Sequence, residues 1–196
     1  MTALPAQPPR LLTVADYLAL GEDPDGVCQE LQEGNVVVSP KPVPEHQIAT
    51  QQLVVQLSDQ VPDGLRAIFD VDVDLQLVPP TGPGTVRAPD VVVVTRTGLA
   101  RRRREGGVLR AEEVRLAVEI VSPGSRRVDK VFKHSEYADA GIPHYWVVDL
   151  GKPGERVTLT AHHLAEPFGY MDPGPVAGTF ATTEPFPVRI DLDALV

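Results

Sequence analysis

The segment Leu116–Tyr137, LAVEIVSPGSRRVDKVFKHSEY, decides the fold that we predict for this chain. Its first six residues form a short apolar run rich in β-branched side chains, which is typical of a buried strand. The segment 122–125 (SPGS) ends this strand, and a helical pattern begins near residues 126–129. The sequence here therefore predicts a buried strand followed by a helix.

Glu119 lies in the middle of this apolar strand. Burial of an ionised carboxylate is costly unless a cation, a metal or a proton compensates it. One interpretation is a buried ion pair with Arg115 or Lys133. The other is one half of a metal-dependent nuclease site, in which a lysine on the following helix (Lys130 or Lys133) lies near the carboxylate. That site requires a second carboxylate on a neighbouring strand, and the residues alone leave both interpretations open.

Upstream of this segment, the pattern predicts a hairpin, a helix and two strands. The hairpin covers residues 27–39 with its turn at Gly34, and the apolar positions of 45–60 share one helical face. Residues 67–78 (AIFDVDVDLQLV) alternate between apolar and polar side chains, which indicates a strand with one solvated face. The continuous apolar run at 88–95 (APDVVVVT) indicates an interior strand.

Downstream, the pattern predicts one more buried strand and then β-rich material. Residues 98–113 contain the basic run Arg101–Arg104 and are expected to form an exposed loop or a short helix. The run at 144–150 (HYWVVDL) is a second buried strand, and short strands and turns follow from residue 151. We therefore predict an α/β (α+β) protein: a mixed β-sheet flanked by helices, with an N-terminal hairpin and a β-rich C-terminal extension.

Length and composition restrict the architecture and the compartment. The first ten residues (MTALPAQPPR) are Pro-rich and are expected to be a flexible tail, and residues 11–196 are expected to form a single domain. Cys28 is the only cysteine, which excludes an internal disulfide and a multi-cysteine zinc site and fits a reducing cytoplasm. No signal-peptide pattern and no apolar run of about 18 residues occurs, so we expect no membrane association.

The net charge of −9 bears on possible partners. Lys and Arg drive binding to a phosphate backbone, so an acidic protein is expected to bind DNA weakly. Carboxylates that hold a metal contribute negative charge until a divalent cation binds, so the charge does not exclude a nuclease.

Three features in order resemble the PD-(D/E)XK nuclease fold, and more closely the Uma2 family of restriction-endonuclease-like proteins. They are Pro89-Asp90 at the head of one buried run, Glu119-Ile120-Val121 in the next, and a lysine on the following helix. The resemblance extends over QELQEGNVVVSPKPVPEHQ, RAPDVVVV, AVEIVSPGSRRVDKVFKHSEYADAGIPHYWVVD and the ending IDLDALV. It implies a restriction-endonuclease-like core and a metal-dependent endonuclease that hydrolyses DNA phosphodiester bonds. It also implies a homodimer.

In this fold two acidic residues hold a divalent metal and a lysine helps to position or activate the attacking water. Carried over, Asp90 and Glu119 are the metal ligands, with Mg²⁺ as the expected cofactor and Mn²⁺ as a substitute. Magnesium prefers oxygen ligands and is often held by one or two carboxylates together with substrate phosphate. Val121 occupies the usual lysine position, and the family pattern places the lysine at Lys133 rather than Lys130.

The resemblance adds two further candidates. Glu30 matches a glutamate in the family hairpin and is a candidate catalytic carboxylate, while His46 matches a histidine at the start of the first long helix. Glu33 and Asn35 replace the commoner residues around the hairpin turn, so no role follows for the turn itself. Two alternatives to a DNA endonuclease remain: an inactive nuclease fold that serves as a binding or structural module, and a nuclease that acts on RNA.

Overall fold

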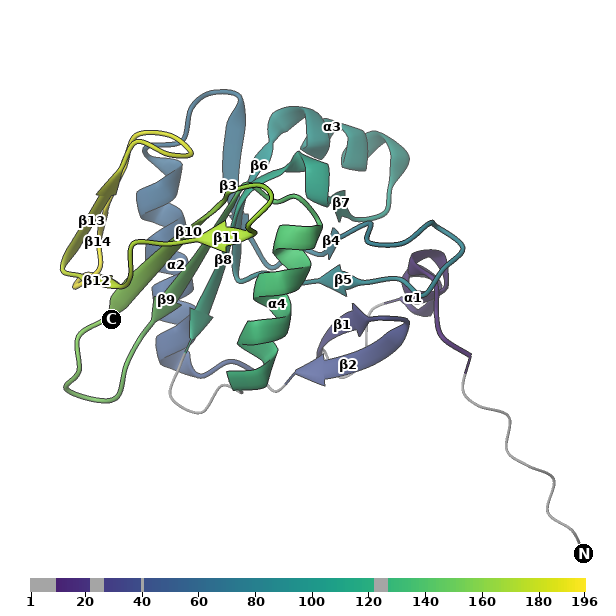
Figure 1. Ribbon diagram of the computed structural model, residues 1–196, viewed down its shortest axis with the longest axis horizontal. Coiled ribbons are helices and arrows are strands. Elements are labelled where there is room, and N and C mark those ends of the chain that lie inside the picture. The colour runs from purple at the N-terminus through teal and green to yellow at the C-terminus, as the bar shows by residue number, and fades with distance from the viewer. Residues whose placement is uncertain (1–9, 22–26, 40, 122–126) are drawn as a thin grey trace, which may run out of the picture.

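The computed structural model describes residues 10–21, 27–39, 41–121 and 127–196 (Figure 1). The predicted tail, residues 1–10, lies outside this part except for Arg10, as do residues 122–126, which follow the central strand.

The described part contains four α-helices, one 3₁₀ turn and three β-sheets. Their order is α1 (Val14–Leu20), β1 (Cys28–Gln32), β2 (Asn35–Ser39), α2 (Pro44–Ser58), β3 (Leu65–Phe69), β4 (Val73–Asp74), β5 (Val86–Arg87), β6 (Val91–Thr95), α3 (Arg96–Glu105), β7 (Leu109–Arg110), η1 (Ala111–Glu113), β8 (Val114–Val121), α4 (Arg127–Asp139), β9 (His144–Asp149), β10 (Thr158–Leu164), β11 (Tyr170–Met171), β12 (Val176–Ala177), β13 (Thr179–Thr182) and β14 (Val188–Asp191).

The largest sheet carries the central strand β8. Its strand order is β11-β10-β9-β8-β6-β3, with β12 paired to β10. The β8–β9 pair is parallel and the other pairs are antiparallel, so the sheet is mixed, as predicted. Strand β6 is buried from Val91 to Val94, which explains its continuous apolar run.

A second sheet, of order β2-β1-β5-β4-β7, contains the predicted hairpin. Strands β1 and β2 pair antiparallel from Cys28↔Ser39 to Gln32↔Asn35. Glu33 and Gly34 have φ values of 46° and 79°, as a tight two-residue hairpin turn requires. The C-terminal strands β13 and β14 form a separate two-stranded sheet.

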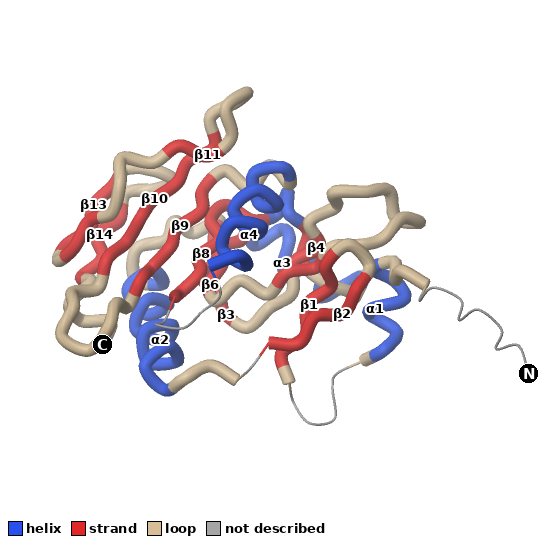
Figure 2. Tube along the Cα trace, turned by 60° about the horizontal axis from the view of Figure 1, so that its bottom comes forward, coloured by secondary structure: helices blue, strands red, loops and turns tan. Residues whose placement is uncertain are grey.

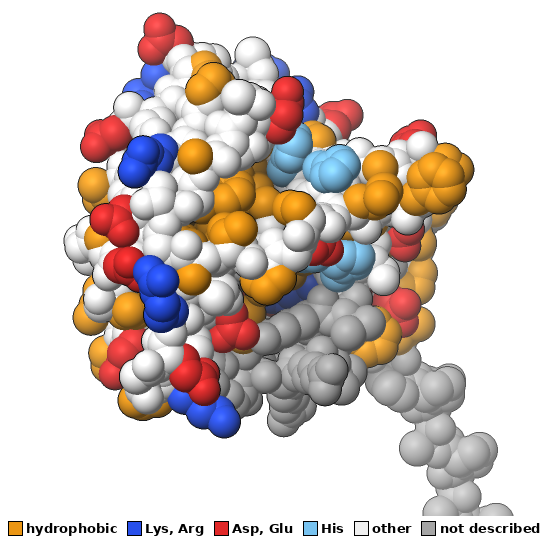
Figure 3. Space-filling view, turned by 60° about the vertical axis from the view of Figure 1, so that its left-hand side comes forward, with side chains coloured by type: hydrophobic (Ala, Val, Ile, Leu, Met, Phe, Trp, Pro, Cys, Tyr) orange, Lys and Arg blue, Asp and Glu red, His pale blue; other side chains and the backbone are white. Residues whose placement is uncertain are grey.

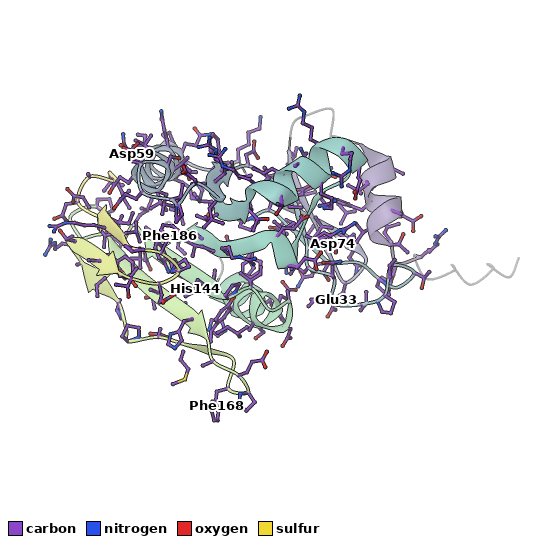
Figure 4. All side chains as sticks on the ribbon, turned by 90° about the horizontal axis from the view of Figure 1, so that it is seen from above. Glu33, Asp59, Asp74, His144, Phe168 and Phe186 are labelled. Atoms are coloured by element: carbon purple, nitrogen blue, oxygen red, sulfur yellow. The ribbon has the colours of Figure 1, made fainter. Side chains whose placement is uncertain are left out.

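Two hydrophobic cores lie on opposite faces of the large sheet. Helix α2 buries Leu53 and Leu57 against one face, together with the β13–β14 hairpin. Helix α4 buries Tyr137 against the other face. Figure 4 shows α2, which leads to Asp59, and α4 on opposite sides of the sheet. Figures 1 and 2 both show α4 between the large sheet and the β1–β2 hairpin.

The prediction of one continuous strand over residues 67–78 is wrong. Asp70 has a φ of 55°, and this left-handed residue ends β3. The chain then leaves the large sheet and enters the second one as β4. The alternation still reports burial, because Val73 and Leu75 are buried in the core beneath α4. Periodicity detected the buried side but not the change of sheet.

The basic run Arg101–Arg104 lies on α3, so of the two predicted forms, an exposed loop or a short helix, the chain adopts the helix. The hydroxyl of Thr95 caps the helix by accepting a hydrogen bond from the Gly98 amide, and Gly106, at φ 76°, ends it. In the described part of the chain, no helix is long and apolar enough to cross a membrane.

Candidate active site

The pairing of β6 with β8 brings Asp90 next to Glu119. Val91 lies opposite Val118, so the residue before β6 lies beside position 119 of β8. Asp90 Oδ2 accepts a hydrogen bond from the Ile120 amide at 2.6 Å, which fixes this carboxylate against the edge of β8. The second carboxylate that the nuclease interpretation requires is therefore present on the neighbouring strand.

Glu119 points toward α4 and is mostly buried. Lys133 Nζ lies 3.2 Å and 3.1 Å from its two carboxylate oxygens, and the Tyr137 hydroxyl donates a hydrogen bond to Oε1 at 2.8 Å. Burial raises the pKa of Glu119 to about 7; the negative charges of Asp90 and Glu30 add to this effect, and Lys133 opposes it. Glu119 thus changes protonation near neutral pH.

Lys133, on α4, contacts a glutamate of each of the two larger sheets. Its side chain is 9% exposed, and its Nζ lies 3.1 Å from Glu30 Oε1 as well as close to Glu119. Lys133 and Tyr137 are four residues apart and project from the same face of α4 toward Glu119. The side chain of Lys130 lies outside the described part of the structure.

Glu30 belongs to a buried network of charges on the other side of Lys133. It accepts hydrogen bonds from Arg87 Nη1 at 2.8 Å and from the Ala88 amide at 3.0 Å. Arg87 also donates two hydrogen bonds to the Glu136 carboxylate, at 2.6 Å and 2.9 Å. Burial raises the pKa of Glu30, but Lys133 and Arg87 outweigh it, so the pKa lies below its usual value. Glu30 is therefore ionised at neutral pH.

His46 lies at the start of α2 and contacts Asp90. Its Nε2 is 3.1 Å from Asp90 Oδ2. The hydrogen bond to Asp90 raises the pKa of His46 above its ordinary value, and burial opposes this shift. The histidine that the resemblance singled out thus shares a carboxylate oxygen with the Ile120 amide.

Sequence reasoning missed Arg87 and Glu136, although each left a weak signal. Arg87 precedes the run that contains Asp90, and Glu136 is one helical turn beyond Lys133. Their contact joins residues 49 positions apart in the chain, and no local pattern reports such a contact.

The basic run is not part of this group. Arg101 is held by Glu113 and by the Val108 carbonyl, which gives it a structural role. Arg102–Arg104 are exposed on α3, which follows the carboxyl end of β6, whereas Asp90 precedes its amino end. On the face shown in Figure 3, basic side chains lie singly between acidic ones.

Other candidate clusters do not gather into a site either. His162 contacts Asp172 and stacks on Tyr145, and burial lowers its pKa. Burial, with the charges of Glu30 and Asp70, raises the pKa of Asp72 to about 6. Among the described residues, no group of three or more His, Cys, Asp and Glu side chains is arranged to hold a metal ion.

The donor set suits a divalent metal held by two carboxylates. The cluster contains four carboxylates and two cationic groups: Glu30, Asp90, Glu119 and Glu136, with Arg87 and Lys133. When all the acids are ionised and His46 is neutral, its net charge is therefore −2. The charge of one Mg²⁺ equals this excess. Mg²⁺ also accepts a site with one or two carboxylates because it retains water or substrate phosphate as its other ligands.

Comparison with known proteins identifies a family and a similar fold. The family model Uma2, described as "Putative restriction endonuclease", matches residues 14–173. Among curated proteins, no sequence matches the chain. A solved structure described as "a putative nuclease belonging to DUF820" from Anabaena variabilis has a similar fold, with a TM-score of 0.65. The two sequences are 17% identical, and the match covers 94% of this chain and 97% of that one.

Proposed function

The chain belongs to the Uma2 family of restriction-endonuclease-like proteins, and we propose that it is a metal-dependent endonuclease that hydrolyses DNA phosphodiester bonds. The observation that carries this proposal is the adjacent pair Asp90 and Glu119 with the Lys133 ammonium group against Glu119. Paired carboxylates beside a buried lysine suit phosphoryl transfer, where charge on the phosphate oxygens must be neutralised.

Asp90 and Glu119 are the residues that would hold Mg²⁺ or Mn²⁺. A bound divalent ion neutralises charge on phosphoryl oxygens and lowers the pKa of a coordinated water. Lys133 supplies a positive point charge beside Glu119, where it can orient a water molecule and stabilise the charge that develops on phosphate. Tyr137 holds Glu119 in place through its hydrogen bond. Asp90 is held in the same way by the Ile120 amide.

We expect two copies of the chain to act together, because cleavage of a duplex requires two cuts. We also expect the protein to act in the cytoplasm, which fits its single cysteine. Strand β2 supports the expected dimer. It lies at an edge of its sheet, its residues carry no charge, and Val36, Val37 and Val38 are 37–57% exposed. An uncharged, apolar edge strand favours pairing with another chain. Light scattering that showed only a species of about 21 kDa would contradict the dimer.

A second candidate function follows from the closed ion network. Glu119 has Lys133 and Tyr137 as partners without any metal, so the same cluster also suits an inactive scaffold. Metal-dependent cleavage separates the two functions, and the choice of substrate separates DNA from RNA.

The test is cleavage of supercoiled plasmid, single-stranded DNA and RNA in Mg²⁺ or Mn²⁺ by the wild type and by Asp90→Asn. Asn retains the shape and the hydrogen bond from Ile120 but loses the charge that a metal requires. The exposed Glu105→Gln is the matched control, because it also removes one carboxylate charge but lies on α3.

We expect wild type and Glu105→Gln to cut the plasmid and Asp90→Asn to lose at least about a hundredfold in rate. Cleavage confined to RNA would replace the substrate. Equal rates for Asp90→Asn and the wild type would refute the proposed site.

A further inference from the structure

Arg87 is the least exposed of the described charged side chains, at 1%. Three of its N–H groups are engaged: Nε and Nη2 with the two oxygens of Glu136, and Nη1 with Glu30. A guanidinium held by a bidentate carboxylate is fixed in its plane as well as in its position. Arg87 has no surface from which it could contact a phosphate, so its role must be exerted through its partners.

Glu30 passes this restraint to Lys133. Its Oε2 accepts from Arg87, and its Oε1 accepts from the Ala88 amide at 3.0 Å and lies 3.1 Å from Lys133 Nζ. The Glu30 carboxylate is thereby held by Arg87 in β5 and by the amide of the next residue, Ala88, and it faces the ammonium group of Lys133. Both of its oxygens are occupied by donors of this chain.

The contacts close a ring between helix and sheet. Lys133 and Glu136 are three residues apart and share one face of α4, and Glu30 and Arg87 lie on the neighbouring strands β1 and β5. Figures 1 and 2 both show α4 beside these strands. Two bridges, Arg87–Glu136 and Glu30–Lys133, therefore tie α4 to the smaller sheet, while Lys133 reaches Glu119 on the larger one.

We propose that Arg87 is a positioning residue: it couples Glu30 to Glu136, so that Glu30 holds the Lys133 ammonium group against Glu119, and Glu30 itself does not bind the metal. This inference rests on the proposed function for its effect on catalysis. The two carboxylates that share Lys133 differ in their neighbours. Both accept from donors of this chain, but Glu30 is held by Arg87 and the Ala88 amide, whereas Glu119 lies beside Asp90 and can join it in binding a cation.

The ring also accounts for the position of the lysine on α4, at Lys133, instead of on β8, where Val121 occupies the usual lysine position. A lysine on β8 would be fixed by the strand itself, but Lys133 lies on a helix and has a long flexible side chain. Such a side chain loses rotamer freedom when it is held in one position. The Arg87 ring fixes both the helix and the acceptor, which gives Lys133 one location between two carboxylates.

The first test reads the Lys133 side chain directly and does not depend on cleavage. The chain has four lysines, so ¹³C-labelled lysine gives a simple NMR spectrum in which Lys133→Arg identifies the Lys133 Cε signal. Glu136→Gln keeps the shape of the side chain but removes the charge that fixes Arg87. We expect it to shift or broaden the Lys133 signal, whereas the exposed control Glu105→Gln leaves that signal unchanged.

The second test uses kinetics and metal binding. Glu30→Gln and Glu136→Gln should each lower kcat by about 10–100-fold, with KM and Mg²⁺ affinity unchanged. The double variant should be no slower than Glu30→Gln alone, because Glu136 acts through Glu30. Thermal unfolding shows whether each variant is folded at the assay temperature. If Glu30→Gln is unfolded there, Glu136→Gln alone is compared with the wild type.

Three outcomes overturn the inference: an unchanged Lys133 signal in Glu136→Gln, additive losses in the double variant, or loss of Mg²⁺ binding in Glu30→Gln. The last outcome would make Glu30 a metal ligand. A wild type that cleaves no nucleic acid would refute the proposed function and leave the NMR test of the ring intact.

Discussion

The protonation of Glu119 makes a quantitative prediction about metal binding. Its pKa is raised to about 7, chiefly by burial, and a metal binds the ionised carboxylate. A group with this pKa is about 9% ionised at pH 6 and about 91% at pH 8, so Mg²⁺ affinity should increase about tenfold, or about 1.4 kcal/mol, between these values. The direction follows from competition, because the proton and the proposed metal ion would occupy the same carboxylate.

The assay is isothermal titration of Mg²⁺ at pH 6, 7 and 8 in buffers with different ionisation enthalpies. At pH 6 each metal ion should release about one proton, and at pH 8 about a tenth of a proton. Glu119→Gln and Asp90→Asn should not bind at any of these pH values, and Glu105→Gln should match the wild type.

His46 requires its own control because Asp90 raises its pKa above the ordinary value, and its imidazolium would oppose a cation on Asp90. His46→Asn should retain most of the pH dependence if Glu119 causes it. An affinity that is flat from pH 6 to pH 8, with no proton release, would refute the assignment of Glu119 as a metal ligand with a raised pKa.

Three further predictions concern stability and assembly. The folded protein binds the Glu119 proton more tightly than the unfolded chain does. Metal-free wild type should therefore lose stability as the pH rises from about 4.5 to 7. Glu119→Gln should reduce that loss in denaturant titrations. Gly98→Ala should destabilise the protein although Ala favours helices, because the new Cβ would lie 2.7 Å from Glu113 Cβ and displace the partner of Arg101; a raised melting temperature would contradict this. Val38→Lys, at the most exposed valine of β2, should leave the protein folded and reduce the mass in light scattering from a dimer to a monomer. A retained dimer would exclude the β2 edge as the interface.

The order of apolar and polar residues predicted the strands and the hairpin whose conformation depends on neighbouring residues in the chain. The β-branched runs at β6 and β8 were predicted as buried strands because their side chains are mostly apolar on both faces. The hairpin followed from its Gly34 turn. Asp70 shows the limit, because its left-handed backbone breaks a perfect apolar–polar alternation that predicts one strand. Asp is enriched among the non-glycine residues that adopt this conformation, but the alternation contains no sign of which Asp does so.

The site divides in the same way. The resemblance predicted Asp90, Glu119, Lys133 and Glu30, and the fold brings these four side chains into one network. Their metal-binding and catalytic roles stay predictions. The Arg87–Glu136 bridge was not predicted, because it is made by packing α4 against a sheet whose strands come from much earlier in the chain.

The distribution of charge explains how an acidic chain can suit a phosphate substrate. The cluster around Lys133 has two more negative than positive charges when its acids are ionised and His46 is neutral. A phosphodiester would therefore be repelled until a divalent cation occupies the carboxylate pair. Burial is the main cause of the raised pKa of Glu119, and the negative charges of Asp90 and Glu30 add to it, so in the absence of metal a proton compensates part of the excess charge. If Asp90 and Glu119 bind the metal, then metal binding, proton release and admission of substrate would all depend on this charge balance, which arises where β6 sets Asp90 beside Glu119 and α4 brings Lys133 to Glu119.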